Sequence, residues 1–227
     1  MFVLLYGAEH IFPQRKNHGS REHDIKNMLI GGMNLLITFL AGYYFQKLIV
    51  WLQIRGYGLF NWLALSHYFS LILQLLMLDL YMYGWHRINH VNSFLWKFHR
   101  FHHLDTEMNS TTALRFHAVE LLLSYIFRIL IFPFFGFSIS AIVVYSLLFF
   151  PIVVLHHSNI FISDKTDRLF RKLFVSPRMH RIHHSNKTAE TNSNYSSVFP
   201  WWDRIFKTYR NRPKEHIQFG VEPSAGR

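Results

Sequence analysis

The chain has 227 residues, of which 50% are hydrophobic and 18% aromatic, and its formal net charge is +11. A soluble nucleic-acid-binding domain of this charge rarely carries so many Phe and Leu residues, and here they run in long blocks that favour a membrane protein. The sequence contains no cysteine. Disulfides, thiolate metal sites and cysteine nucleophiles are therefore excluded, and any metal must be held by nitrogen and oxygen.

Four apolar blocks are predicted to be transmembrane helices. They cover about residues 28–52, 59–85, 118–134 and 137–155, and Pro133 and Gly136 predict a tight turn between the last two. The first two blocks have the length of full spans, and the other two lie near the lower limit. Buried helices of a soluble core are the alternative, which the block lengths disfavour. We therefore expect an all-α integral membrane bundle of about four transmembrane helices, forming a single domain over residues 1–227.

The distribution of Lys and Arg predicts the orientation in the membrane. Basic residues precede the first block, lie between the second and third, and follow the fourth, whereas the other two connections hold only Arg55. Basic connections face the cytoplasm. Both termini and a helical cap of residues 86–117 and 156–210 are therefore expected on the cytoplasmic side of a bacterial inner membrane or the endoplasmic reticulum. Much of the charge would face anionic headgroups, and the tail 211–227 is expected to be flexible.

Histidine clusters are the strongest motif. The pattern His-x-x-His-His occurs twice, whereas random placement of 16 histidines predicts about 0.1 copies. Spacings of three and four residues place side chains on one helical face, and imidazole is the commonest protein ligand for metals. Ser93 is the predicted N-cap of the helix that carries the first copy. The candidate ligands are His86 and His90, the first copy (His99, His102, His103), the second copy (His180, His183, His184), and one of His156 or His157.

Nine candidate ligands exceed the needs of one ion. A structural zinc uses four ligands and a catalytic zinc uses three and a water, so nine imidazoles suit two ions with open positions. Two first-row ions in a nitrogen shell beside a bilayer suggest oxygen chemistry on a lipid, although the ligand set alone leaves zinc or another metal open.

Asp79 shares one helical face with Tyr83, His86 and His90 at spacings of four, three and four residues. A carboxylate within a span is costly unless it is paired, and it is a functional candidate by default. Two roles are open. Asp79 accepts the free N–H of a ligand imidazole and so orients it, or it pairs with Arg87.

Several further segments accompany the histidines in a fixed order. They are Asp79-Leu-Tyr-Met-Tyr-Gly-Trp-His86-Arg87-Ile-Asn-His90, His99-Arg-Phe-His102-His103, Leu114-Arg115-Phe-His117-Ala-Val-Glu120, His157-Ser-Asn159, Ser176-Pro177-Arg178-Met-His180-Arg-Ile-His183-His184, Asn194-Tyr195 and Trp202-Asp203-Arg204-Ile-Phe206-Lys-Thr208-Tyr209. In order and spacing, over about residues 21–209, the sequence resembles the fatty acid hydroxylase/sterol desaturase superfamily of integral-membrane di-iron enzymes.

The resemblance implies that the histidines ligate two irons, which use O2 to hydroxylate or dehydrogenate an unactivated C–H bond. It favours His157 over His156 and adds His117 as a ligand or a neighbour of one. It makes Asn159, Trp202 and Asp203 supports of the site or of the cap. The chain departs from the family pattern at three positions outside the ligand set: Ser196 and Lys207 replace Gly, and Ala118 replaces a frequent Pro. These departures concern local backbone geometry.

The expected function is a membrane-bound oxidoreductase that hydroxylates or desaturates a lipid such as a sterol, hopanoid or fatty acyl chain. Aromatic residues of the spans (Tyr43, Tyr44, Phe45, Phe69, Phe149, Phe150) either line a substrate tunnel or face lipid. Electrons are expected from a separate cytochrome, ferredoxin or reductase, because no flavin or nicotinamide fingerprint is present, and no nucleic-acid partner is expected. A metal-ion transporter would need ligands near the midplane and repeated halves. A zinc-stabilised membrane protein would need fewer histidines.

Overall fold

The computed structural model describes residues 1–16, 19–211 and 217–222, which confirm the predicted all-α class. Within these residues the only β-structure is two isolated bridges. The elements in chain order are α1 (Phe2–Ile11), α2 (Arg21–Ile54), α3 (Leu59–Trp62), α4 (His67–Val91), α5 (Ser93–His103), the 3-10 helix η1 (Ser110–Leu114), α6 (Ala118–Phe135), α7 (Ile139–His157), α8 (Asp164–Phe170), α9 (Pro177–His183), α10 (Thr188–Thr191) and α11 (Trp201–Ile205).

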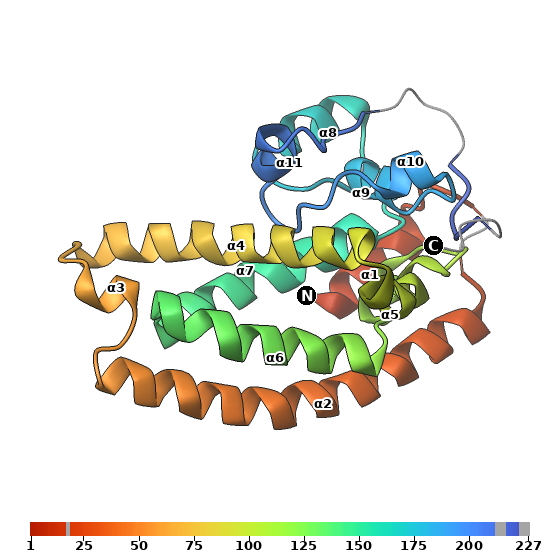
Figure 1. Ribbon diagram of the computed structural model, residues 1–227. Coiled ribbons are helices and arrows are strands. Elements are labelled where there is room, and N and C mark those ends of the chain that lie inside the picture. The colour runs from red at the N-terminus through yellow and green to blue at the C-terminus, as the bar shows by residue number, and fades with distance from the viewer. Residues whose placement is uncertain (17–18, 212–216, 223–227) are drawn as a thin grey trace.

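The long helices α2, α4, α6 and α7 form a bundle, and the shorter helices other than α3 gather toward one end of it as a cap (Figure 1). Helix α3 lies at the other end, between α2 and α4. Within the bundle α2 packs on α6, and α4 packs on α7. Apolar side chains from all four helices, including Phe45, Leu78, Phe132 and Tyr145, form the bundle core. The apolar blocks therefore build the scaffold, and the polar segments between them build the cap.

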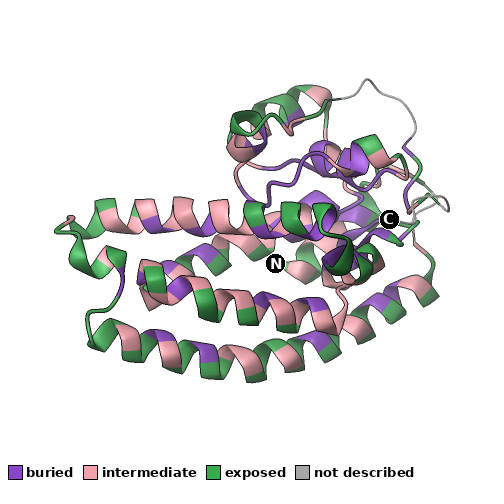
Figure 2. Cartoon of the chain, viewed as in Figure 1, coloured by how far each residue is buried: buried purple, intermediate pink, exposed green. Residues whose placement is uncertain are grey.

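Within the described residues, three helical segments are long and apolar enough to cross a membrane: Arg21–Trp62, Ala118–Phe135 and Ile139–His157. Their outer faces carry exposed large apolar side chains such as Phe39, Leu130 and Leu147, and Figure 2 shows exposed residues along the outside of the bundle. Apolar surface of this extent marks a face that lipid covers. The first, third and fourth predicted spans therefore have the length and composition of transmembrane helices.

The second predicted span, about residues 59–85, differs from the prediction. It is divided into the short helix α3 and the long helix α4, and α4 is not among the three apolar segments. The reason is polarity, since Gln74 and Asp79 interrupt its apolar run and both are buried. Helix α4 is thus the long helix of the bundle that carries buried polar side chains within its apolar run.

A glycine contact closes the end of the bundle opposite the cap. Gly136 ends α6 in the left-handed conformation, with φ of 69°, as a helix C-cap glycine commonly does. Gly58 lies against it so closely that a Cβ on Gly58 would overlap the Gly136 backbone. The turn predicted at Gly136 is confirmed, but Pro133 lies inside α6 and does not end the helix.

The tail predicted to be flexible, residues 211–227, falls partly outside the described residues, which omit 212–216 and 223–227. Its described part is packed: Ile217 and Phe219 are buried in a cluster with Met108 and Ile182. In this part the two apolar side chains pack on the helix that carries the second histidine motif, and the flexibility of the tail stays a prediction.

Candidate metal centre

The first histidine pair and the first motif copy come from two consecutive helices. Helix α4 continues to Val91, and the Asn92 side chain then caps α5 by accepting the backbone N–H groups of Phe94 and Leu95. The predicted N-cap, Ser93, is instead the first residue of α5, because the longer side chain of Asn92 already satisfies the free N–H groups. Packing of α4 on α5 brings their histidines together.

The second motif copy lies on α9, which packs against the end of α7. Ser176 caps α9 by accepting the N–H of Met179, and Pro177 occupies the first turn, which is the usual place for proline in a helix. His157 ends α7. Four separate segments therefore deliver histidines to one point in the cap.

Nine histidines converge in two groups, within each of which one donor atom per residue lies within 4.8 Å of all the others. The first group is His86, His90, His99, His103 and His183, and the second is His102, His157, His180 and His184. Each motif copy is divided between the groups, because adjacent residues in a helix point about 100° apart. The two copies therefore interleave, and neither forms a site alone.

Hydrogen bonds at Nδ1 fix the orientation of five of these rings. Carbonyl and carboxylate oxygens only accept, so each of these Nδ1 atoms donates and Nε2 keeps its lone pair. The Nδ1 contacts are His86 to Tyr195 O (2.7 Å), His99 to Glu120 Oε1 (2.8 Å), His102 to Arg115 O (3.2 Å), His157 to Val153 O (2.7 Å) and His183 to Ser193 O (2.7 Å).

The Nε2 atoms turn toward one another. In the second group the Nε2 of His157 lies 3.0 Å from that of His102 and 3.0 Å from that of His180. In the first group the Nε2 atoms of His99 and His183 are buried without a hydrogen-bond partner. Buried polar atoms are normally satisfied, so convergent lone pairs of this kind fit a bound cation in each group.

The charge state of the rings agrees with this fit. Burial lowers the pKa of His183 to about 3 and lowers the pKa of His103 well below its ordinary value. Both rings are therefore neutral at pH 7, which is the form that a metal ion requires of an imidazole ligand.

Glu120 is a site residue that the histidine spacing does not predict. It lies in the first turn of α6, and its buried Oε1 accepts from His99 Nδ1 at 2.8 Å. A carboxylate that holds a ligand imidazole in this way fixes its tautomer and raises its basicity. One sequence feature could have identified it: Glu120 is the sole acidic residue of the apolar block 118–135.

The two roles predicted for Asp79 are both wrong. Among the hydrogen bonds and ion pairs of the described residues, none joins its carboxylate to a candidate ligand imidazole or to Arg87. The carboxylate accepts from the Tyr145 hydroxyl at 2.7 Å, the Trp202 indole N–H at 2.8 Å and the Phe199 backbone N–H at 3.0 Å. These donors come from α7, α11 and the segment before α11. Asp79 therefore joins the bundle to the cap, because the packing of α4 turns it toward α7 and away from the histidines.

The other predicted site residues lie around the groups. His117 lies outside both groups and caps α6, its Nδ1 accepting the Val119 N–H at 3.1 Å. His156 also lies outside, with its ring centroid 3.9 Å from that of His180. Asn159 bonds to the backbone of Arg15.

Asp203 supports the first group indirectly, through the backbone of the loop that contacts His86. It accepts the backbone N–H groups of Tyr195 at 2.8 Å and Ser196 at 2.9 Å. Tyr195 is the residue whose carbonyl orients His86. Asp203 therefore positions a loop that positions a histidine, and it touches no imidazole itself.

Lys207 adopts φ of +58°, a conformation that favours glycine. Replacing Lys207 with Gly is expected to raise the free energy of unfolding by about 1 kcal/mol, because it removes the steric cost of the left-handed conformation. The opposite change is expected for Lys97→Gly, which places glycine inside α5 and costs about 1 kcal/mol. Thermal unfolding in detergent measures both. Metal loss in the Lys207→Gly protein would contradict the position of Lys207 outside the histidine groups.

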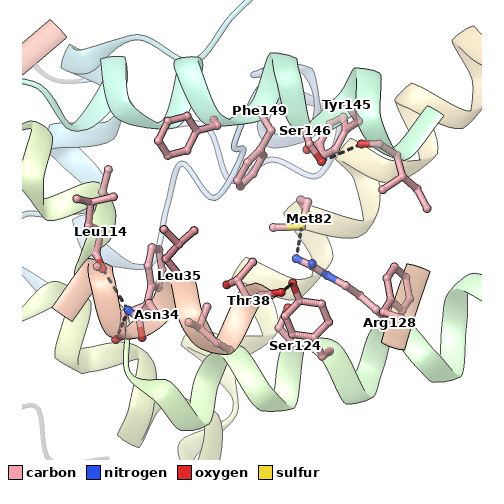
Figure 3. Close-up of a pocket in the computed structure, with 18 of the residues that line it drawn as sticks. Asn34, Leu35, Thr38, Met82, Leu114, Ser124, Arg128, Tyr145, Ser146 and Phe149 are labelled. Carbon is pink, nitrogen blue, oxygen red and sulfur yellow. Dashed lines mark hydrogen bonds between the residues drawn. The ribbon is translucent and has the colours of Figure 1, made fainter. Parts of the chain in front are cut away.

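An apolar chamber of about 660 Å³ lies inside the bundle (Figure 3), and a smaller cavity of about 160 Å³ lies beside the histidines. Of the predicted tunnel residues, Phe45, Phe149 and Phe150 line the chamber, whereas Tyr43, Tyr44 and Phe69 are exposed on the outside of the bundle. The two cavities share part of their walls. The common residues are Met82, Phe116, Leu121, Ser124, Arg128 and Phe149. The chamber therefore adjoins the histidine groups.

Comparison with known proteins assigns this arrangement to a family. The model of the fatty acid hydroxylase family matches residues 71–208, which hold both histidine groups and make up more than half of the chain. The chain belongs to the fatty acid hydroxylase family. The superfamily predicted from the motifs is thereby confirmed. Membership in this family, together with the three apolar helices, identifies an integral membrane protein.

Relatives of this fatty acid hydroxylase family member include lipid-modifying enzymes. It is 28% identical to ornithine lipid hydroxylase OlsE of Rhizobium tropici over 146 residues, 64% of the chain and 43% of the relative. It is 27% identical to the alkylglycerol monooxygenase of Homo sapiens over 169 residues, 74% of the chain and 36% of the relative. The chain thus spans less than half the length of these relatives. No solved structure matches it.

Proposed function

We propose that this protein is a membrane oxygenase that hydroxylates a lipid at a di-iron centre. The observation that carries the proposal is the pair of buried histidine groups, five and four rings, beside an apolar chamber. Its relatives are a lipid hydroxylase and a monooxygenase, which favours hydroxylation over desaturation. Ligands at one end of the bundle argue against ion transport, which needs them near the midplane.

Nine imidazoles suit two first-row ions, and family membership supports iron, with zinc as a substitute metal. When bound, the irons supply activation of O2 toward an unreactive C–H bond. The protein's own contribution is positional. The Nδ1 hydrogen bonds hold the rings with Nε2 inward, and Glu120 adds negative charge behind His99.

The chamber and the smaller cavity supply the second contribution. Their common wall gives a lipid chain a route from the bundle to the histidines. Phe149 and Met82 line both spaces and keep that route apolar. Exclusion of bulk water protects a reactive centre from side reactions.

The overall reaction requires an external reductant. Inserting one oxygen atom consumes the C–H substrate, O2, two electrons and two protons, and it releases the alcohol and one water. The sequence carries no flavin or nicotinamide fingerprint, so a separate cytochrome, ferredoxin or reductase supplies the electrons. The basic cap faces the cytoplasm in this proposal, where it meets such a donor.

Incubation under 18O2 tests the proposal. Membranes from cells that express the protein are expected to contain a lipid heavier by one labelled oxygen atom, and cells with the His102→Ala protein are expected to lack it. A lipid that loses two hydrogens without gaining label would indicate desaturation instead. An unchanged lipid profile in cells that contain iron-loaded protein and a reductant would contradict the oxygenase.

Replacing Glu120 with Ala is expected to weaken metal binding about 10- to 100-fold, because His99 loses the acceptor that orients it. Glu120→Gln keeps an acceptor oxygen and is expected to weaken binding less. Competition with a chelator, followed by metal analysis, measures both variants. Equal affinity in the Glu120→Ala and unaltered proteins would show that His99 needs no carboxylate.

A further inference from the structure

Arg128 is a charged residue in the middle of the apolar helix α6. Its Nε is buried without a hydrogen-bond partner, and its Nη2 reaches the Met82 sulfur at 3.9 Å. The guanidinium carbon lies 5.2 Å from the centroid of the Tyr125 ring. A sulfur atom and an aromatic ring are weak partners for a group that carries five N–H donors.

No carboxylate of the described chain forms an ion pair with Arg128. Two carboxylates of the bundle already have other partners: Asp79 accepts from Tyr145, Trp202 and the backbone of Phe199, and Glu120 accepts from His99. The Tyr81 hydroxyl also interacts with Arg128, but this neutral group does not balance the charge of the guanidinium. The helix therefore keeps an uncompensated cation within the apolar region, where such charges are costly and mark functional sites.

The side chain of Arg128 lies where the chamber meets the smaller cavity. Arg128 lines both the chamber and the smaller cavity beside the histidines. Figure 3 shows its guanidinium reaching from α6 toward Met82, which lines both cavities as well. Arginine near the end of a span can extend its side chain to the aqueous surface. Arg128 instead lies mid-helix and projects to the junction of the two cavities.

We propose that Arg128 binds an anionic oxygen group, a carboxylate or a phosphate, of the lipid whose chain occupies the chamber. This inference rests on the proposed function for the identity of the occupant as substrate. The planar guanidinium matches both groups through paired N–H···O bonds. In the apolar surroundings that Phe149 and Leu121 supply, such a pair is stronger than at the surface.

The size of the smaller cavity indicates which carbon atoms of the lipid reach the histidines. Its volume of about 160 Å³ is about a quarter of the 660 Å³ of the chamber, so it holds only a short segment of a lipid. A lipid held by its anionic group at the junction can place a short segment beside the histidines. Oxygen is therefore inserted within a few bonds of the anionic group and not at the far end of the chain.

Lipid binding to the full-length protein in phosphatidylcholine nanodiscs tests the role of Arg128. The probes are three ligands of equal chain length: hexadecanoate, hexadecyl phosphate and the neutral hexadecanol. The unaltered protein is expected to bind at least one anionic probe at least about tenfold more tightly than the alcohol. Arg128→Met is expected to bind all three alike, with unchanged affinity for the alcohol. The control Arg55→Met removes an exposed arginine of the bundle and is expected to keep the preference.

Each outcome decides the inference. A preference for carboxylate or for phosphate supports it and identifies the group. Equal binding by the unaltered protein, or a preference that survives in Arg128→Met, overturns it. If Arg128→Met also binds the alcohol more weakly, misfolding can account for the loss, and the preference of Arg128→Lys for the anionic probes over the alcohol is measured instead. A reduced but measurable preference supports the inference, and an unchanged or absent one overturns it.

The same nanodiscs separate this inference from the oxygenase itself. With iron-loaded protein and an added reductant, an Arg128-dependent anion preference without incorporation of 18O2 would overturn the proposed function and leave the binding site standing. Incorporation of 18O into lipid without any preference for the anionic probes would overturn the binding site and leave the proposed function standing. Mass spectrometric fragmentation of the labelled product then reads the oxidised carbon, and a hydroxyl at the far end of the chain would contradict the expected position.

Discussion

Replacing His102 with Ala is expected to abolish lipid hydroxylation and to remove bound metal at the same time. His102 contributes one of the four converging nitrogens of the second group, and His183 one of the five of the first. Loss of a ligand itself should cost more than the about 100-fold that follows loss of a hydrogen-bond partner of a ligand. His183→Ala is therefore expected to have the same effect through the other group.

The control for these variants is His67→Ala, because His67 is exposed at the start of α4, distant in sequence from the histidine groups. It is expected to keep full metal content and turnover. Metal analysis and 18O2 incorporation on the same preparation measure the three variants. Wild-type turnover with full metal in His102→Ala would end the assignment of that residue as a ligand.

Replacing Asp79 with Ala is expected to lower the free energy of unfolding by about 3–6 kcal/mol, since three donors lose their buried acceptor. Asp79→Asn keeps one acceptor oxygen and is expected to cost about 1–3 kcal/mol. Unfolding of the purified protein in a series of denaturing detergent mixtures measures the order of the three proteins. Unaltered stability of Asp79→Ala would show that these bonds do not join the cap to the bundle.

The helical scaffold and the candidate histidines could largely be predicted from the sequence, because both depend on local spacing. Apolar blocks of sufficient length form helices that lipid can cover, and the histidines stand at helix ends in a recurring pattern. The second block shows the limit of this reasoning. Its length suggested one span, but Gln74 and Asp79 lower the hydropathy of α4, which is not among the three apolar segments.

The distribution of histidines between the groups could not be predicted. His102 and His103 are neighbours in the chain and separate into different groups, which depends on how α5 faces α9 and the end of α7. The partners of Asp79 depend on the same tertiary packing, since the donors lie 66 and 123 residues away in Tyr145 and Trp202. Long-range packing of this kind leaves no trace in local spacing.

Arg128 illustrates a signal that the sequence did contain. A single cation in the apolar run 118–135 is visible by inspection, and intramembrane charges are functional candidates. Only the structure adds that the charge lies at the junction of two cavities and lacks a carboxylate partner among the described residues.

The most direct test of the central claim is the iron content of the full-length protein, purified in detergent and related to protein concentration by amino-acid analysis. Two groups of converging nitrogens predict close to two irons per chain. A value near one, reproducible after loading with excess Fe²⁺ under anaerobic conditions, would contradict the binuclear centre.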